Sequence, residues 1–339
     1  MDTKSNSFRK ELLDTDVTQA SSIAIERAVQ ELQAGGVIAF PTETVYGLGA
    51  DASNPEAVRQ IFTIKGRPEN HPLIVHIRDE QQLPQWCADV PESAYRLSEK
   101  FWPGPLTLIL PHSKAPLSVT GGQGSVGLRA PSHPVAQALL RAFGGGIAAP
   151  SANRFGRISP TQSDHVREEL GSRINIILEG GDCAVGLEST ILSLTNPTPC
   201  LLRPGAISQS ELEDTLGQRI SGVERAGGLR ASGLLDSHYA PRTPLHLVKR
   251  ELIAPLIAKT KGRIGLITLE GETSHDVAHQ ISLSNVPAAY GNRLYATLRT
   301  LDSAGLDLII AESPPLDEGW AAIHDRLGRA SYDSSRPDR

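Results

Sequence analysis

The segment 36–76 constrains this chain more than any other, because two short apolar runs within it each end in polar residues. Residues 37–40 are wholly apolar and follow two glycines, which favours a buried strand. Pro41 ends that strand, since proline cannot donate to a sheet ladder, and a glycine-rich turn is expected over 47–49. A second apolar run, 73–75, ends at a histidine. We therefore expect two strands to deliver hydroxyls and an imidazole to one ligand crevice of an α/β fold.

Two cations, Lys65 and Arg67, flank a glycine between these predicted strands. An ammonium beside a planar guanidinium, next to exposed backbone, is suited to a triphosphate. The alternative is that both are exposed cations at a helix end. The chain has no G-x-x-x-x-G-K-[ST] phosphate loop, so a nucleotide site here would be built from scattered cations and hydroxyls.

Other polar residues occur in short motifs further along the chain. In S-V-G-L-R-A-P, period-two alternation places Ser125 and Arg129 on one face of a strand, which suits an acidic ligand. The alternative is an arginine on an edge strand. Ser151 and Asn153 follow a glycine-rich turn, and their alternative role is turn formation. The G-L-E-S-T motif and Arg203 in L-R-P-G are weak signals when each is taken alone.

Helical and strand patterns interleave throughout the chain, which predicts an α/β protein with a mixed, twisted sheet. Helices are predicted over 22–33, 55–64, 91–101, 133–143, 208–216, 292–301 and 320–329. Strands are predicted over 37–40, 73–75, 106–110, 125–128, 147–149, 174–178, 189–194, 200–203, 245–248, 263–269 and 306–312.

A chain of 339 residues is too long for most single cores, and a stretch rich in glycine, serine and proline over 227–241 divides it. We expect five segments in chain order. They are a flexible N-terminus over 1–20, a catalytic domain over 21–225, a linker and lid over 226–243, a small C-terminal α/β domain over 244–331 and a polar tail over 332–339.

Composition excludes several classes of protein. A net charge of −5 argues against nucleic acid binding along a whole face. Three cysteines without a C-x-x-C pattern are typical of free thiols in a reducing cytosol. The longest apolar stretch, 105–110, is too short to span a bilayer, so we predict a cytoplasmic protein with no membrane partner. The spacing of the histidines does not match a zinc site. The chain has no G-x-S-x-G motif, so the sequence does not support a serine hydrolase.

The motifs P-T-E-T-V-Y-G, K-G-R-P, S-V-G-L-R-x-P, A-P-S-A-N, G-x-E-S-T and L-R-P-G occur together and in this order. In this pattern the chain resembles the threonylcarbamoyl-AMP synthase family and its YrdC-like domain. H-Y-A-P, N-R-L-Y-x-x-L-R-x-L-D and D-R-L-x-R-A resemble the two-domain form of that family. The resemblance covers roughly residues 20–330. It implies a YrdC-like twisted mixed sheet with helices, followed by a small Rossmann-like C-terminal domain.

The resemblance also implies a reaction, in which a nucleotidyltransferase converts L-threonine, bicarbonate (or CO2) and ATP into threonylcarbamoyl-AMP and pyrophosphate. Mg2+ would be carried mainly by the ATP, with no metal held by the protein alone. The product would feed the N6-threonylcarbamoylation of adenosine 37 in tRNA, so tRNA and downstream threonylcarbamoyl-transferase proteins are implied partners. The alternatives are an RNA-binding module and a carbamoyl transferase acting on another acceptor.

Site residues carry over position by position. The resemblance implies a catalytic tetrad of Lys65, Arg67, Ser151 and Asn153, L-threonine contacts from Thr44, His76, Arg129 and Ser189, and ATP contacts from Arg67, His71, Ser125, Ser151, Ser159, Arg203 and Tyr239. The chain departs from the family twice. His71 stands where the family often has asparagine, and the linker ending in H-Y-A-P is less basic than in many members.

Overall fold

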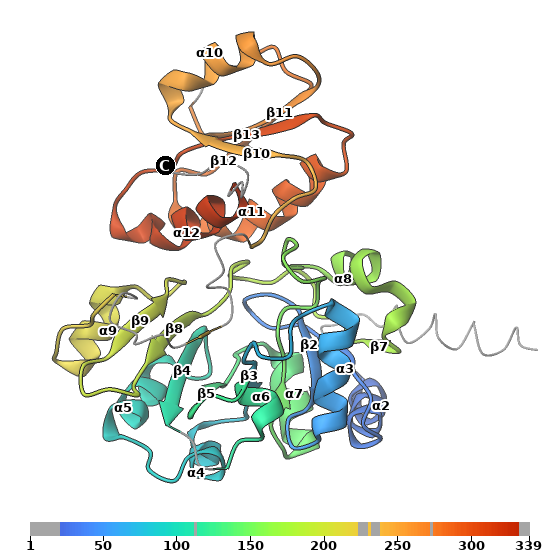
Figure 1. The fold of residues 1–339 in the computed structure, drawn as a ribbon, viewed down its shortest axis with the longest axis vertical. Helices are drawn as coiled ribbons and strands as arrows, with labels where there is room; N and C mark the ends of the chain where they lie inside the picture. Colours follow the sequence, from blue (N-terminus) through green and yellow to red (C-terminus); the bar gives the residue numbers. More distant parts are fainter. Residues whose placement is uncertain (1–20, 112–113, 223–229, 232–237, 272–273, 332–339) are drawn as a thin grey trace, which may run out of the picture.

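The structure is a computed structural model that describes residues 21–111, 114–222, 230–231, 238–271 and 274–331. Within these ranges the chain forms a nine-stranded mixed sheet followed by a four-stranded parallel sheet, each packed against helices (Figure 1). The predicted α/β fold class is therefore confirmed. The predicted flexible N-terminus, the polar tail and most of the predicted linker lie outside the described residues.

The first sheet contains β1 (Ile38–Phe40), β2 (Gly47–Asp51), β3 (Ile74–His76), β4 (Leu106–Pro111), β5 (Ser125–Arg129), β6 (Ile147–Ala148), β7 (Ile176–Ile177), β8 (Thr190–Ser193) and β9 (Cys200–Arg203). Its helices are α2 (Ser22–Gln33), α3 (Pro55–Lys65), α4 (Leu83–Trp86), α5 (Glu92–Phe101), α6 (Leu117–Thr120), α7 (Pro134–Phe143), α8 (Ser163–Leu170) and α9 (Gln209–Leu216). The second sheet contains β10 (Leu245–Val248), β11 (Ile264–Leu269), β12 (His279–Leu283) and β13 (Leu308–Glu312), with helices α10 (Arg250–Lys259), α11 (Pro287–Asp302) and α12 (Ala321–Ala330).

Strand direction in the first sheet, whose order is β7-β1-β2-β6-β3-β5-β4-β8-β9, brings four polar residues to one end of adjacent strands. β3 and β5 are parallel, and His76 lies opposite Arg129 at their carboxyl ends. β8 runs in the opposite direction, so Ser189, which precedes it, lies at the same end. β9 is antiparallel to β8 and returns Arg203 to that end. The sheet thus gathers residues that are far apart in the sequence.

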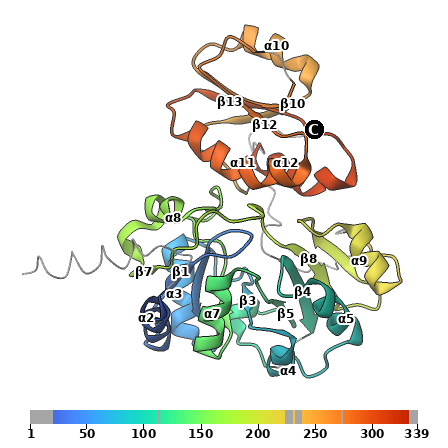
Figure 2. The same ribbon diagram turned by 180° about the vertical axis from the view of Figure 1, so that it is seen from behind.

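The two faces of the first sheet are covered by different helices (Figures 1 and 2). A large core joins one face to α3, α5, α6, α8 and α9. A second core joins α2 and α7 to the other face through Ile38, Phe40 and Ile147. His76 belongs to this second face, since its ring meets the ring of Phe40 edge-on at 5.9 Å between centroids.

Helix ends follow their sequence signals closely. The side chain of Asn54 caps α3 by accepting hydrogen bonds from the backbone N–H groups of Glu56 and Ala57, and Pro55 occupies the first turn. Ser208 and Glu211 form a reciprocal capping box at α9. Because α3 ends at Lys65, its C-terminus delivers the K-G-R-P motif to the sheet.

The glycine-rich stretch after Pro41 is a strand, β2, paired antiparallel with β1, so the predicted turn over 47–49 is wrong. Its glycines reflect crowding rather than a turn. A Cβ at Gly49 would lie 2.7 Å from the Phe40 ring and 2.8 Å from Ile147. The sequence patterns also missed the helices α4, α6, α8 and α10 and the strand β12 among the described elements.

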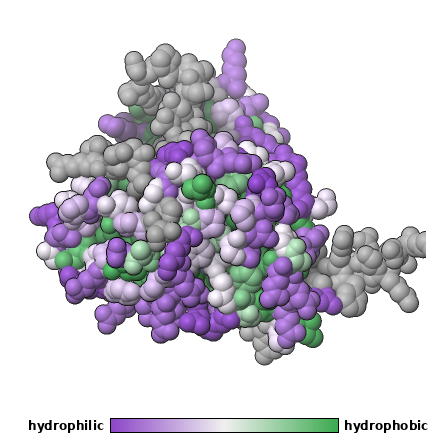
Figure 3. Space-filling model, turned by 60° about the horizontal axis from the view of Figure 1, so that its bottom comes forward, coloured by the Kyte–Doolittle hydropathy of each residue, from purple (hydrophilic) through white to green (hydrophobic). Residues whose placement is uncertain are grey.

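The second sheet lies between α10 on one face and α11 and α12 on the other, and the latter pair faces the first sheet (Figures 1 and 2). A hydrophobic cluster continues across this junction, joining Val45, Ile158 and Leu187 to residues of α11 and α12. In the face drawn in Figure 3, hydrophilic residues predominate and hydrophobic residues form small separate patches. No helix in the described part of the chain is long and apolar enough to cross a membrane.

Candidate active site

A cavity of about 50 Å³ brings most of the predicted site residues together. It is lined by Thr44, Val45, Arg67, Ile74, His76, Arg129, Ala149, Pro150, Ser151, Glu188, Ser189, Arg203, His238 and Tyr239. The lining residues come from seven strands or loops of the first sheet and from the chain that leads into the second sheet. The cavity wall therefore combines three guanidinium groups with hydroxyls and neutral rings.

Arg129 is held in a fixed orientation by three buried contacts. Its Nη2 donates to Glu43 Oε1 at 2.6 Å, its Nη1 to Thr44 Oγ1 at 2.9 Å and its Nε to the Gly104 backbone oxygen at 3.2 Å. The other Glu43 oxygen accepts from the backbone N–H of Ser132 at 2.9 Å. A guanidinium has five N–H donors, so these contacts leave capacity for an acidic ligand.

His76 and Ser189 add neutral polar groups to the same wall. Burial, and then the nearby charge of Arg129, lowers the pKa of His76 to about 3, so the imidazole is neutral at physiological pH. Its Nδ1 is buried and has no hydrogen-bond partner among the described residues. The Ser189 hydroxyl is 2.7 Å from Thr107 Oγ1 and accepts from Arg203 Nη2 at 3.1 Å.

Lys65 organises the loop that carries Ser151 and Asn153. Its Nζ donates to the backbone oxygens of both residues, and burial, followed by the charge of Arg67, moves its pKa well below the ordinary lysine range. The Asn153 amide donates to the backbone oxygens of Arg154 and Arg157, at 2.8 Å each. Its Oδ1 is buried with no hydrogen-bond partner among the described residues, so a ligand could supply one.

Arg67 lies beside this loop. Its Nη2 donates to the Pro72 backbone oxygen at 2.9 Å, and its guanidinium is 5.7 Å from the centre of the Phe155 ring. Burial lowers the pKa of Arg67 to about 10, which still leaves it charged at neutral pH. His71 is half-buried, and its ring meets the ring of Phe155 edge-on, with 5.5 Å between the centroids.

Glu188 is a carboxylate of the cavity wall that the sequence reasoning did not single out. Its oxygens accept from Ser159 Oγ at 2.6 Å, from Tyr295 Oη at 2.9 Å and from Arg326 Nε at 2.8 Å. Burial opposes its ionisation, but the charges of Arg326 and Arg203 hold its pKa at about 2. Two of these donors, Tyr295 and Arg326, come from helices of the second sheet.

Tyr239 closes the cavity on the side of the second sheet. Its backbone has φ +62, which is unusual for a bulky residue, and its side chain is buried. Its ring stacks on Tyr295 with centroids 5.7 Å apart and lies 5.3 Å from the guanidinium carbon of Arg326. His238 packs against its other side, at 4.1 Å between centroids.

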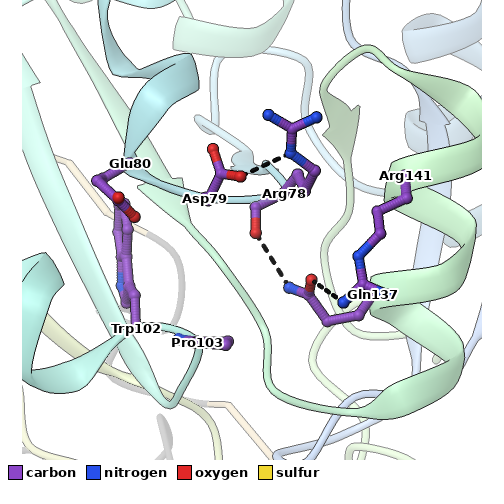
Figure 4. A pocket seen from close by; sticks show the side chains of 7 residues that line it. All are labelled: Arg78, Asp79, Glu80, Trp102, Pro103, Gln137 and Arg141. Atoms are coloured by element: carbon purple, nitrogen blue, oxygen red, sulfur yellow. Dashed lines mark hydrogen bonds and ion pairs between the residues drawn. The ribbon is translucent and has the colours of Figure 1, made fainter.

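A larger, open cavity of about 480 Å³ lies elsewhere on the first domain and contains none of the predicted site residues (Figure 4). Two of its charged groups, Arg78 and Asp79, form an ion pair, and Arg141 bonds to an uncharged neighbour. Arg78 Nε donates to Asp79 at 2.6 Å, and Arg141 donates to the side-chain oxygen of Gln137 at 3.2 Å. We therefore assign the functional site to the smaller cavity, where polar groups converge on a shared space.

Comparison with known proteins identifies the family of the chain. A family model described as "Telomere recombination" matches residues 30–205, and one described as "Threonylcarbamoyl-AMP synthase, C-terminal domain" matches residues 207–331. Threonylcarbamoyl-AMP synthase of Bacillus subtilis is 41% identical, over 94% of this chain and 95% of the relative. That of Pyrococcus abyssi is 39% identical, over 88% of this chain and 92% of the relative.

The chain belongs to the threonylcarbamoyl-AMP synthase family. A crystal structure of P. abyssi Sua5 complexed with L-threonine is 38% identical, with a TM-score of 0.86, over 92% of this chain and 95% of that chain. The match confirms the predicted family and its two-domain form. The full-length relatives also favour the synthase interpretation over the RNA-binding and other-acceptor alternatives.

The site residues predicted from the family resemblance fall into three groups according to where they lie relative to the cavity. Those that line the cavity are Thr44, Arg67, His76, Arg129, Ser151, Ser189, Arg203 and Tyr239. Lys65, Asn153 and Ser159 are buried behind the wall and contact lining residues or their backbone. His71 and Ser125 do not line the cavity, and Ser125 is buried in β5.

The residues missed in this synthase site are Glu43, Thr107, Glu188, Tyr295 and Arg326. Glu43 and Glu188 both lie inside family motifs, P-T-E-T and G-x-E-S-T, beside hydroxyl residues with predicted roles. Their partners are 86 and 138 residues away in sequence, so no local pattern could pair them. Arg326 lies in the motif D-R-L-x-R-A, for which the sequence predicts no role in the site.

Proposed function

We propose that this chain is an L-threonylcarbamoyladenylate synthase, a nucleotidyltransferase that forms threonylcarbamoyl-AMP and pyrophosphate from L-threonine, bicarbonate (or CO2) and ATP. The observation that carries the proposal is the convergence of Arg67, Arg129 and Arg203 on one buried cavity in a chain that matches synthases along almost its full length. Three guanidinium groups suit a carboxylate and a triphosphate bound side by side.

The Arg129 end of the cavity is the proposed threonine subsite. Contacts to Glu43, Thr44 and Gly104 fix the guanidinium plane, so its remaining donors are pre-oriented for a carboxylate. A neutral His76 can accept a hydrogen bond from the amine of threonine, but a pKa near 3 makes it a weak base. We therefore assign it to orienting the amine rather than to deprotonating it.

The Arg67 and Arg203 end is the proposed ATP subsite. After the threonine amine adds to CO2 and its released proton passes to water, a carbamate oxygen attacks the α-phosphorus and the bond to pyrophosphate breaks. Such a displacement depends on alignment and on neutralisation of charge, which two arginines beside the Ser151 loop can supply. Tyr239 lines this end and Ser159 lies behind Glu188, and we propose that both contact ATP.

Magnesium belongs with the nucleotide in this scheme. No group of three or more histidine, cysteine, aspartate or glutamate side chains in the described ranges could hold a metal ion. The carboxylate of Glu188 is already engaged by Ser159, Tyr295 and Arg326. We therefore treat MgATP as the substrate, with the ion coordinated by phosphate oxygens and water.

Substrate binding must enlarge the cavity. A volume of about 50 Å³ compares with roughly 300–1,000 Å³ for typical small-molecule sites. Tyr239, with its strained backbone, is the wall residue best suited to move, and its return would shield a labile mixed anhydride from water. The proposed acceptor of the product is adenosine 37 of tRNA in the cytoplasm, reached through downstream transferase proteins.

The test is release of pyrophosphate from MgATP with and without L-threonine and bicarbonate. Wild-type protein is expected to release pyrophosphate only when both co-substrates are present, and Arg67→Ala is expected to abolish most of that release. Arg59→Ala is the matched control, because Arg59 is an exposed arginine on the adjoining helix α3. Release that is indifferent to threonine, or no release at all, would overturn the proposal.

A further inference from the structure

Arg326 is the arginine most completely enclosed at the junction of the two domains. It belongs to α12 of the second sheet, yet its side chain has 0% exposure and reaches into the first domain. Its Nε donates to Glu188 Oε2 at 2.8 Å, and its Nη2 donates to the Pro204 backbone oxygen at 3.1 Å. Pro204 follows Arg203 in the L-R-P-G motif, so one side chain touches two segments of the cavity wall.

Glu188 places a negative charge in the part of the cavity where the proposed ATP phosphates bind. It lines the cavity together with Arg67 and Arg203, and Ser159 donates to it. An unneutralised carboxylate in a buried, weakly screened site would repel a triphosphate strongly. Arg326 does not line the cavity itself, so any influence it has on ATP passes through Glu188.

We infer that Arg326 is a positioning residue through which the C-terminal domain cancels the charge of Glu188 and fixes its carboxylate, so that the cavity accepts the phosphates of ATP. The inference rests on the proposed synthase function and adds to it a control of ATP affinity from the second domain. Tyr295 supports the same carboxylate from α11 and stacks on Tyr239, so both helices facing the first domain converge on one part of the site.

Two other polar contacts between the domains, among the residues that the structure describes, do not reach the cavity. Arg157 Nη2 donates to Asp302 at 3.0 Å, and the Ser210 backbone N–H donates to Glu318 at 2.9 Å. These contacts join the same two domains, but their residues are absent from the cavity wall. A variant that breaks one of these contacts therefore weakens the junction of the domains without changing the charge next to Glu188.

The experiment measures steady-state pyrophosphate release and, separately, equilibrium binding of MgATP by calorimetry. Arg326→Met leaves Glu188 charged and is expected to raise the KM for ATP by about tenfold or more, with a much smaller change in the KM for threonine. Arg326→Lys keeps the positive charge, and its KM for ATP is expected to lie between those of wild type and Arg326→Met. The double variant Glu188→Gln with Arg326→Met removes both charges and is expected to recover most of the lost ATP affinity.

The control is Asp302→Asn, which breaks the Arg157 contact and should leave the KM for ATP within about twofold of wild type. The inference is overturned if Arg326→Met raises the KM for ATP and the KM for threonine equally and the double variant does not recover the KM for ATP. Arg326 would then have only a structural role. If Arg326→Met does not fold, comparing Arg326→Lys with the double variant decides the same point. Wild-type protein that fails to release pyrophosphate overturns the proposed function instead.

Discussion

Arg129 and Glu43 form a buried ion pair, with Nη2 of the arginine 2.6 Å from Oε1 of the glutamate, although 86 residues separate them in the sequence. Both side chains are less than a tenth exposed. A buried pair of this kind gains little over two apolar residues, but removing one partner leaves an uncompensated charge. Its value is therefore expected to lie in fixing the guanidinium that faces the proposed threonine subsite.

Replacing Glu43 should test this relationship through stability. Glu43→Gln keeps the shape of the side chain and removes its charge, so the free energy of unfolding should fall by about 3–5 kcal/mol. Saturating L-threonine should restore part of the loss, because its carboxylate can take the place of the missing charge beside Arg129. Urea titrations with and without threonine measure both effects.

The matched control is Glu56→Gln, which breaks the exposed pair between Glu56 and Arg59 on α3. Exposed pairs of this kind contribute about 0.2–1 kcal/mol, and threonine should stabilise Glu56→Gln and wild type by the same amount, so that the difference between them does not change. Equal stability of the two variants, or no recovery with threonine for Glu43→Gln, would contradict the assigned role of the buried pair.

Lys65 should matter for catalysis because it anchors the loop that carries Ser151 and Asn153. Its Nζ donates to the backbone oxygens of both residues, and a methionine at this position cannot donate. We expect Lys65→Met to lower kcat for pyrophosphate release by on the order of 100-fold. Lys100→Met on α5 is the control, since Lys100 is an exposed lysine that donates to Thr215 outside the site. Unchanged kcat in Lys65→Met would argue against a catalytic tetrad that includes this lysine.

Three buried histidines predict how stability depends on pH. Burial lowers the pKa values of His76 and His238 to about 3 and that of His165 to about 4. Between these values and 6.5, the unfolded chain binds protons that the folded chain does not bind. The free energy of unfolding should therefore decrease as pH falls from 6.5 towards 4, by up to about 1.4 kcal/mol per pH unit for each histidine.

Chemical unfolding at several pH values checks this slope, and a variant of His165 tests its origin. His165 lies outside the cavity wall, where its Nδ1 accepts from the backbone N–H of Thr161 at 3.3 Å. His165→Gln should give a shallower dependence between pH 6.5 and 4. Glu188, with a pKa near 2, should add a further loss only below about pH 4.5. An unchanged slope in His165→Gln would refute the assignment.

The sequence predicted this fold well where one local pattern decides an element. The helix predicted over 22–33 is α2 (Ser22–Gln33), and β9 and β10 also have their predicted bounds. The predictions failed where a distant contact decides. Gly49 lies in a strand whose neighbours Phe40 and Ile147 leave no room for a side chain. Helix α10 continues through Pro255, although proline normally ends a helix.

The candidate site shows the same division. Hydroxyls and cations could be assigned through motifs, because the motifs are contiguous. The acidic partners could not be assigned in this way. Glu43 pairs with Arg129, and Glu188 with Arg326, only because of how strands and domains pack. Family resemblance predicted the residues of the candidate site but did not indicate that the second domain supplies two of the groups that hold Glu188.

A glycine at the domain junction offers a final test of how the two domains depend on each other. Gly186 has φ +76, and a Cβ there would lie 2.6 Å from the backbone oxygen and 2.7 Å from the Cα of Asn292 on α11. Gly217 has φ +67, but a Cβ there would meet nothing within 4 Å. Gly217→Ala should therefore cost only the strain of the left-handed backbone, about 1–2 kcal/mol.

Gly186→Ala should cost the same strain of the left-handed backbone and should also displace α11. The new Cβ would collide with the backbone of Asn292, which cannot move without moving the helix. The Asn292 side chain donates to the backbone oxygens of Cys183 and Ala184, at 2.8 and 2.9 Å, and these contacts would be disturbed with it. We expect a loss of stability at least about 2 kcal/mol greater than for Gly217→Ala, measured by urea unfolding. Because α11 also carries Tyr295, which holds Glu188, the KM for ATP should rise in Gly186→Ala and not in Gly217→Ala. A rise in both variants, or in neither, would mean that the position of α11 does not govern the ATP subsite.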